Sequence, residues 1–162
     1  MRYFPDHMPV PAVNAETVPW WDACAEHRLV VQRCTQCAAT RHPPGPVCPS
    51  CSSLSSEWAE LAGTGTLYTY TVVRQAFLPG LEVPYVVAVV EPDGGGGTRL
   101  VSNVVEVDPE DVEVGMAVEV VWEDMGPELA LPRFRPLGAA AAGGAAGPGG
   151  AAAAGGAAGP AT

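Results

Sequence analysis

The stretch that decides the fold is Cys34-Thr-Gln-Cys37, followed after ten residues by Cys48-Pro-Ser-Cys51. Two Cys-x-x-Cys knuckles that come together place four thiolates around one point, and four sulfurs in a tetrahedron are what Zn²⁺ prefers in a structural site. Such an ion has no open position for water, so it would hold the fold together rather than catalyse a reaction. The pattern predicts a structural zinc ribbon with Cys34, Cys37, Cys48 and Cys51 as ligands.

The same four cysteines allow other interpretations. They could form two disulfides or lie separately in a core, and iron in a rubredoxin-like cage would use the same ligands. The first eight residues contain no apolar run that could act as a signal peptide. We therefore expect a cytoplasmic protein, and reduced thiols there favour a metal over disulfides. Zinc is the expected cofactor, with iron as the alternative.

Composition excludes several chemistries. The 162 residues carry a formal net charge of −10, and all eight basic residues are Arg. Without Lys, the chain cannot form a Schiff base or supply the lysine of a P-loop. An acidic chain is also a poor nucleic-acid ligand, because neutralising phosphates supplies much of that affinity.

The two ends of the chain differ from its centre. Residues 138–162 consist of Ala, Gly, Pro and one Thr, which cannot bury enough surface to offset the entropy of ordering. They also lack the strongly apolar run that a membrane span needs, so we expect a disordered low-complexity tail and no membrane contact. The proline-containing residues 1–16 predict an extended arm.

Between Thr17 and His27 the pattern becomes helical, with Thr17 as a possible N-cap and with Trp20 and Cys24 on one face. Trp20 and Trp21 are adjacent and cannot both point into one small core. We therefore expect this helix to contact a partner protein. The unpaired Cys24 is expected to be a small core residue rather than a nucleophile.

The helix and the ribbon together are expected to occupy residues 17–58. A short strand at Leu29–Arg33 leads into the first knuckle, and the loop between the knuckles is too rich in proline for a helix or a central strand. Pro43 and Pro44 in this loop are a second expected partner contact. His42 beside them is predicted to be an exposed loop residue.

After Trp58, runs of β-branched and aromatic residues alternate with turn signals. The expected strands are Thr66–Arg74, Pro84–Glu91, Arg99–Val107, Ala117–Glu123 and Leu129–Arg135. Asp108 followed by Pro109 predicts a short helical turn between the third and fourth strands. This plan is typical of a five-stranded OB-fold over residues 59–137, with an SH3-like barrel or an open meander as alternatives. The fold class is therefore mainly β.

With helix, ribbon and barrel in this order, residues 17–137 resemble the acyl-CoA-associated zinc-ribbon/OB-fold family. The motifs that carry the resemblance are Trp20-Trp21-Asp22-Ala23, Arg28-Leu29-Val-Val-Gln32-Arg-Cys34, Pro43-Pro44, Val47-Cys48-Pro-Ser-Cys51, Gly65-Thr66-Leu-Tyr68-Thr-Tyr70, Pro84-Tyr85-Val-Val-Ala-Val-Val, Asp108-Pro-Glu-Asp-Val112, Gly115-Met116 and Leu131-Pro-Arg-Phe134-Arg-Pro136. The sequence departs from the family pattern at His27 and Ala38, two turn positions where the family usually has glycine.

The resemblance implies a non-catalytic subunit of a hetero-oligomer. Members of this family look like partners of thiolase-like enzymes, including lipid-transfer-protein-type aldolases that cleave steroid side-chain CoA thioesters. Some are fused to, or paired with, enoyl-CoA hydratases of the MaoC type. The chain would then bind the enzyme and help to enclose the acyl-CoA, and carbon–carbon chemistry would belong to the partner. The chain's own residues agree, because no nucleophile–base set or phosphate-binding loop is evident.

Coenzyme A brings phosphates and an adenine, so a CoA site would need Arg beside an aromatic ring. Arg133-Phe134-Arg135 offers this combination, and Arg74 with Phe77 is the second candidate. The alternative is that these Arg side chains pair with surface carboxylates. Two other functions stay open: a single-stranded nucleic-acid-binding OB module that stacks bases on its tyrosines, and an iron electron carrier.

Overall fold

The structure, a computed structural model, describes residues 3, 5 and 9–139. Almost all of the predicted tail, and most of the predicted arm before residue 9, lie outside the described residues. The elements are α1 (Val18–Ala25), β1 (Val30–Cys34), β2 (Thr40–Arg41), β3 (Ser56–Glu60), β4 (Thr64–Val73), β5 (Tyr85–Pro92), β6 (Leu100–Val104), the 3-10 turn η1 (Pro109–Asp111), β7 (Ala117–Gly126) and β8 (Leu129–Pro136).

The ribbon is a three-stranded antiparallel sheet in the order β2-β1-β3. The sequence pattern predicts β1 but neither of its neighbours. β2 has only two residues, and β3 carries Glu57 and Glu60 with little apolar content. β3 forms because it pairs with β1 along its whole length, from Val30 opposite Glu60 to Cys34 opposite Ser56. Pairing, rather than hydrophobic pattern, defines this strand.

The five remaining strands close into a barrel in the order β4-β5-β6-β8-β7, with β7 returning to β4. All neighbours are antiparallel except β6 and β8, which meet in parallel at Val104 and Phe134. The predicted OB-fold is confirmed, and closure excludes the open meander. The predicted turn between the third and fourth strands is also present, because the Asp108 carboxylate accepts the Glu110 backbone N–H at 3.0 Å.

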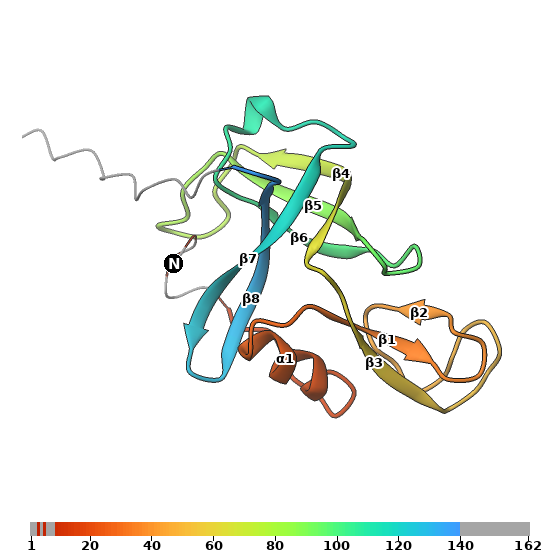
Figure 1. Ribbon diagram of the computed structural model, residues 1–162. Helices are drawn as coiled ribbons and strands as arrows, with labels where there is room; N and C mark the ends of the chain where they lie inside the picture. The colour runs from red at the N-terminus through yellow and green to blue at the C-terminus, as the bar shows by residue number, and fades with distance from the viewer. Residues whose placement is uncertain (1–2, 4, 6–8, 140–162) are drawn as a thin grey trace, which may run out of the picture.

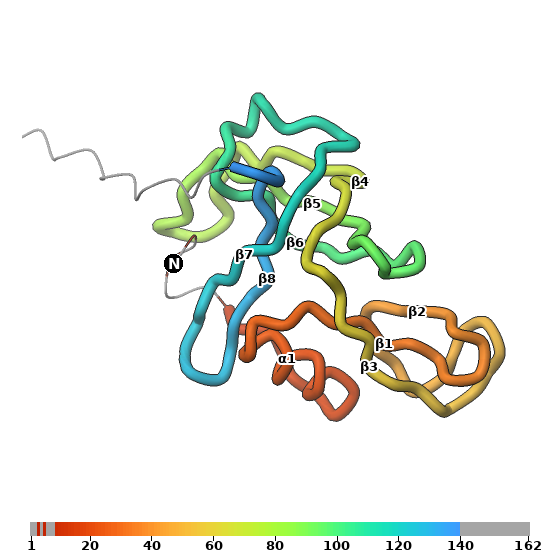
Figure 2. The backbone as a smooth tube through the Cα atoms, in the orientation of Figure 1, coloured from red at the N-terminus to blue at the C-terminus, as the bar shows by residue number. Residues whose placement is uncertain are grey.

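Helix α1 joins ribbon and barrel. It packs against β8 and β1, and Figure 1 shows it beside the lower ends of β7 and β8, between the hairpin and the ribbon. Trp20, Cys24, Leu29 and Val30 belong to the same buried cluster as the barrel residue Leu67. The backbone then passes from β3 into β4 through only a short connection, which Figure 2 traces. One continuous core therefore serves both parts.

His27 and Ala38, the two positions where the sequence departs from the pattern of the family it resembles, have left-handed backbone, with φ of 58° and 61°. Glycine adopts this conformation without the steric penalty of a Cβ. His27 is nevertheless held in place, because its ring stacks on Trp122 and its Nε2 lies 2.7 Å from Asp124 Oδ1. These contacts offset part of the local strain.

The glycine-rich β5–β6 loop ties the barrel to the ribbon. Thr40 donates from Oγ1 to the Gly95 carbonyl at 2.5 Å and accepts from Thr98 Oγ1 at 2.9 Å. A Cβ on Gly96 would lie only 2.7 Å from Thr40 Oγ1. Close approach of the two parts therefore requires glycine at this position.

Replacing Gly96 with Ala is expected to lower the free energy of unfolding more than replacing Gly97 with Ala. Both residues have left-handed backbone, at φ of 60° and 82°, and a side chain at Gly97 would meet nothing within 4 Å. The difference therefore isolates the Thr40 contact, and about 1 kcal/mol is expected for its lost hydrogen bonds. Urea unfolding of the two variants measures it, and equal stabilities would contradict the contact.

Candidate metal centre and binding surfaces

The four predicted ligands come together at one end of the ribbon. Cys34 ends β1, Cys37 follows in the next turn, and Cys48 and Cys51 form the second turn before β3. Their Sγ atoms all lie within 4.8 Å of one another, and the Cys34–Cys51 and Cys37–Cys48 pairs are each 3.6 Å apart. A tetrahedral ion with metal–sulfur bonds of ~2.3 Å needs sulfurs about 3.8 Å apart. The residues fit a bound metal.

Backbone N–H groups prepare two of the sulfurs for this role. Hydrogen bonds from the backbone N–H groups of Cys37 and Gln36 lower the pKa of Cys34 to about 6, and the Ser50 N–H lowers the pKa of Cys48. The Ser53 N–H also favours ionised Cys51, but neighbouring sulfurs and burial outweigh it and raise the pKa of Cys51. Four thiolates cannot share this volume unless a cation compensates them.

The alternative of two disulfides does not fit this arrangement. All five cysteines are free. The Cys34–Cys51 and Cys37–Cys48 pairs are each 3.6 Å apart, far above the ~2.05 Å of a disulfide bond. Cys24 lies apart, fully buried in the core, where burial raises the pKa of its thiol to about 12. Its predicted role as a small core residue is confirmed.

The predicted CoA contact at Arg133, Phe134 and Arg135 is not available on the surface of this chain. Phe134 is fully buried in the barrel core, so its ring cannot stack on an adenine. Arg133 lies 2.7 Å from Glu123, and Arg135 lies 2.9 Å from Glu119 and 3.1 Å from Glu106. Both guanidinium groups are engaged by carboxylates, which is the alternative that the sequence left open. The hypothesis of a CoA site here is wrong for Phe134 and unsupported for the two Arg.

A network around Glu123 was not predicted from the sequence, in which this residue is only the last of the expected strand Ala117–Glu123. Glu123 is fully buried. Its carboxylate accepts hydrogen bonds from Arg133 Nε at 2.8 Å and from the Tyr3 backbone N–H at 2.7 Å, and Arg133 also donates to Asn103 Oδ1 at 2.6 Å. A buried carboxylate needs such partners. Tyr3 lies 120 residues from Glu123 in the sequence, so no local pattern predicts this contact.

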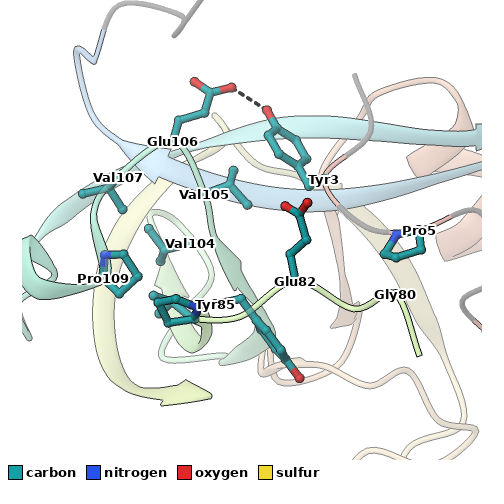
Figure 3. A pocket seen from close by; sticks show the side chains of 12 residues that line it. Tyr3, Pro5, Gly80, Glu82, Tyr85, Val104, Val105, Glu106, Val107 and Pro109 are labelled. Carbon is teal, nitrogen blue, oxygen red and sulfur yellow. Dashed lines mark hydrogen bonds between the residues drawn. The ribbon is translucent and has the colours of Figure 1, made fainter. Parts of the chain in front are cut away.

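A pocket of about 430 Å³ opens beside this network, between the β4–β5 loop, the end of β6 and η1. Figure 3 shows Tyr3 reaching Glu106, with which its hydroxyl forms a hydrogen bond of 2.5 Å. Burial, followed by this hydrogen bond, raises the pKa of Tyr3 to about 12. The remaining lining is mostly apolar, with Glu82 as a second carboxylate. Two carboxylates disfavour a phosphate, so this pocket does not suit the CoA head group.

Arg74 and Phe77, the other predicted CoA contact, lie on the exposed β4–β5 side of the barrel. Phe77 is 74% exposed, and among the large apolar residues of the described chain only Leu54 and Val101, at 75% each, exceed it. Arg74 forms an ion pair with Glu110, but its side chain stays 62% exposed. Unlike Arg133 and Arg135, this pair can meet a ligand or a partner without a rearrangement of the core.

The predicted partner contacts divide in a similar way. Trp20 is buried and donates from its indole nitrogen to the Val30 carbonyl at 3.1 Å, so the prediction that it faces a partner is wrong. Trp21 is partly exposed and packs edge-on against Trp20. Pro43 is exposed and Pro44 half-buried. His42 is not the exposed residue expected, because its ring packs on Trp20 and burial lowers its pKa to about 4.

The ribbon and barrel together define a class of two-part scaffold, and family models identify it. Residues 21–57 match the model described as "ChsH2, rubredoxin-like zinc ribbon domain", and residues 58–123 match "ChsH2, C-terminal OB-fold domain". These matches cover more than half of the chain. The chain belongs to the ChsH2 zinc-ribbon/OB-fold family, which confirms the resemblance stated from the sequence.

Three curated relatives show the range of this family. The chain is 48% identical over 128 residues to a "Probable enoyl-CoA hydratase alpha subunit" of Thermomonospora curvata, covering 79% of this chain and 40% of the relative. It is 31% identical over 132 residues to the "3-oxo-4,17-pregnadiene-20-carboxyl-CoA hydratase alpha subunit" of Mycobacterium tuberculosis, covering 82% and 41%. It is 34% identical over 105 residues to a "DUF35 domain-containing scaffold protein" of Methanocaldococcus jannaschii, covering 64% and 73%.

The chain thus spans about two fifths of the length of the two hydratase subunits. Among solved structures, it is similar to a chain of the "Ltp2-ChsH2(DUF35) aldolase", with a TM-score of 0.72 and 47% identity over 78% of this chain and 98% of that chain. A DUF35-family protein of unknown function from Sulfolobus solfataricus shares the fold, with a TM-score of 0.58 at 12% identity. Within the part of the chain that the structure describes, no helix has the length and apolarity to cross a membrane.

Replacing Cys48 with Ser is expected to abolish metal binding and unfold the ribbon, because three sulfurs hold the ion far less tightly than four. Metal content by mass spectrometry should fall from about one ion per chain towards none, and the amides of β1 and β3 should lose protection from hydrogen exchange. Cys24→Ala, which removes a sulfur outside the cage, serves as the control and should keep its metal. A folded Cys48→Ser ribbon without metal would contradict the structural role.

Replacing Arg133 with Ala is expected to destabilise the barrel by about 3–5 kcal/mol, because it leaves the buried Glu123 carboxylate without its cation. The control is Arg99→Ala, since Arg99 pairs with Glu91 at 3.6 Å on the surface and such pairs contribute at most about 1 kcal/mol. Guanidinium unfolding compares the two. A loss at Arg133 no larger than at Arg99 would mean that the buried pair does not stabilise the barrel.

Proposed function

We propose that this chain is a non-catalytic subunit that binds a thiolase-like, lipid-transfer-protein-type acyl-CoA aldolase and helps to form or stabilise its CoA-thioester site. The observation that carries the proposal is the similarity to the ChsH2(DUF35) component of an Ltp2 aldolase, which extends over 98% of that chain at 47% identity. The pregnadiene carboxyl-CoA named for the mycobacterial relative supports a role in steroid side-chain degradation.

The arrangement of the described residues supports a scaffold rather than an enzyme. The cysteines of the cage are ligands with no open position on the metal. Cys24 is a buried thiol with a raised pKa, and His42 is packed against Trp20. His27, the other described histidine, is paired with Asp124. Among residues 9–139, no cysteine therefore lies beside a histidine as an exposed nucleophile with its base.

Zinc is the metal that we propose for the cage. The donor set of four thiolates and the family's zinc-ribbon description both support it. The ion would hold the two knuckles together and supply no chemistry of its own. An iron site would colour the protein red, whereas a zinc protein is colourless.

Arg74 and Phe77 are the residues that we propose to face the acyl-CoA in the complex. They combine a cation with an exposed aromatic ring, and unlike Phe134 neither of them is buried in the core. Trp21 and Pro43 are proposed to contribute to the contact with the enzyme, because both keep exposed surface.

Mixing this chain with the Ltp2-type aldolase of the same organism is expected to give a stable hetero-oligomer. Size-exclusion chromatography with light scattering measures the complex, and cleavage of an acyl-CoA substrate is then compared with and without the chain. The aldolase should be active or stable only in the complex, while this chain alone should show no cleavage. Two proteins that elute separately, with aldolase activity independent of the chain, would contradict the proposal.

A second candidate function follows from the two hydratase alpha subunits among the relatives. In this alternative the chain binds an enoyl-CoA hydratase of the MaoC type, either in addition to the aldolase or instead of it. A complex with the hydratase but not with the aldolase would favour it. The nucleic-acid alternative gains no support, because the Arg side chains of β8 are paired with carboxylates.

A further inference from the structure

A groove of about 940 Å³ lies between the N-terminal segment, α1 and the β7–β8 hairpin. Its lining consists of Val10, Pro11, Val13, Trp21, Asp22, Ala25, Glu26, Met125, Gly126, Pro127, Glu128 and Leu129. We propose that this groove binds an apolar segment of the partner aldolase that carries Lys or Arg side chains. The inference rests on the proposed function, because it takes the aldolase as the partner.

Several apolar side chains of the groove are exposed to solvent. Val10 and Val13 are 66% and 54% exposed, and Trp21 and Leu129 are only partly covered. These side chains come from separate segments of the chain and still converge on one surface. Convergent apolar surface of this kind, bordered by polar residues, marks an interaction site.

The charge of the groove indicates the character of its occupant. Its lining contains three carboxylates and no basic side chain. Glu26 is already paired with Arg28 at 2.6 Å. The side-chain carboxylates of Asp22 and Glu128 have no hydrogen-bond or ion-pair partner among the residues that the structure describes. Two free carboxylates beside an apolar floor are complementary to cations carried on an apolar segment.

The same charge argues against other occupants. A phosphate-bearing ligand, whether CoA or a nucleic acid, would be repelled by the carboxylates. A second copy of this chain would bring a further net charge of −10. Residues 138–162 of this chain carry neither a cation nor a large apolar side chain, and β8 ends at the opposite end of the barrel from the hairpin (Figure 1).

Two walls of the groove, α1 and the β7–β8 hairpin, are held together without a partner. The stacked His27 and Trp122 rings, with centroids 5.3 Å apart, and the His27–Asp124 contact fasten the end of α1 to the hairpin. The hairpin itself is paired up to Gly126 opposite Leu129. A groove formed in advance spares the partner the entropy of ordering it.

The test combines charge reversal with site-specific cross-linking on the full chain and the Ltp2-type aldolase of the same organism. Asp22→Arg with Glu128→Arg is expected to weaken binding by about 10- to 100-fold, and to reduce its dependence on salt. Glu113→Arg is the matched control, because Glu113 is exposed on the segment between η1 and β7, at the far end of the barrel. Isothermal titration calorimetry measures the affinities.

A photo-reactive residue at Val13 is expected to cross-link to the aldolase, whereas one at Val114, which is 65% exposed near Glu113, is not. If the unmodified chain binds the aldolase but the reversed variant binds equally well, or Val13 fails to cross-link, the groove is not the docking site and the proposed function stands. If the unmodified chain forms no complex with the aldolase, both the groove inference and the proposed function are overturned.

Discussion

The fold of the ribbon depends on a cation that offsets the mutual repulsion of four thiolates. Their Sγ atoms lie within 4.8 Å of one another at the end of a sheet whose outer strands have two and five residues. Such a sheet has too little apolar area to fold alone. Metal binding by comparable small modules supplies on the order of 10 kcal/mol, so the ion largely determines whether the first part of the chain has a defined shape.

The ribbon is joined to the barrel by two different sets of contacts. Trp20 and Cys24 of α1 extend the barrel core towards the ribbon, and Thr40 holds the glycine-rich loop against the ribbon edge. The two connections differ in how directly they involve the metal site. Thr40 lies between the two knuckles, whereas α1 packs against β8, and His27, just beyond the end of α1, is held by Trp122 and Asp124 of β7. The barrel therefore fixes the position of α1 and with it the groove beside the β7–β8 hairpin.

Local sequence signals predicted the elements well and the burial of side chains poorly. Spacing of cysteines, alternation in the strands and the Asp108–Pro109 turn are local, so the ribbon, the OB-fold and η1 could be predicted. The sequence could not show that β3 forms by pairing with β1, that Glu123 is buried by contact with Tyr3, or that Phe134 fills the core. Each of these depends on residues brought together from distant parts of the chain, about which periodicity carries no information.

The pairing of the Arg residues limits what this chain can offer to CoA. Among the Arg residues of the barrel, Arg133 and Arg135 are held by buried or half-buried carboxylates, and Arg99, just before β6, covers the Tyr68 ring at 3.5 Å. Arg74 is thus the most accessible cation of the predicted CoA candidates. A single exposed guanidinium cannot neutralise the several phosphates of CoA, so in a complex most of the counter-charge must come from the enzyme subunit. This division of charge is what the proposed docking requires, in which an acidic chain offers apolar and carboxylate surfaces to a basic partner that holds the CoA.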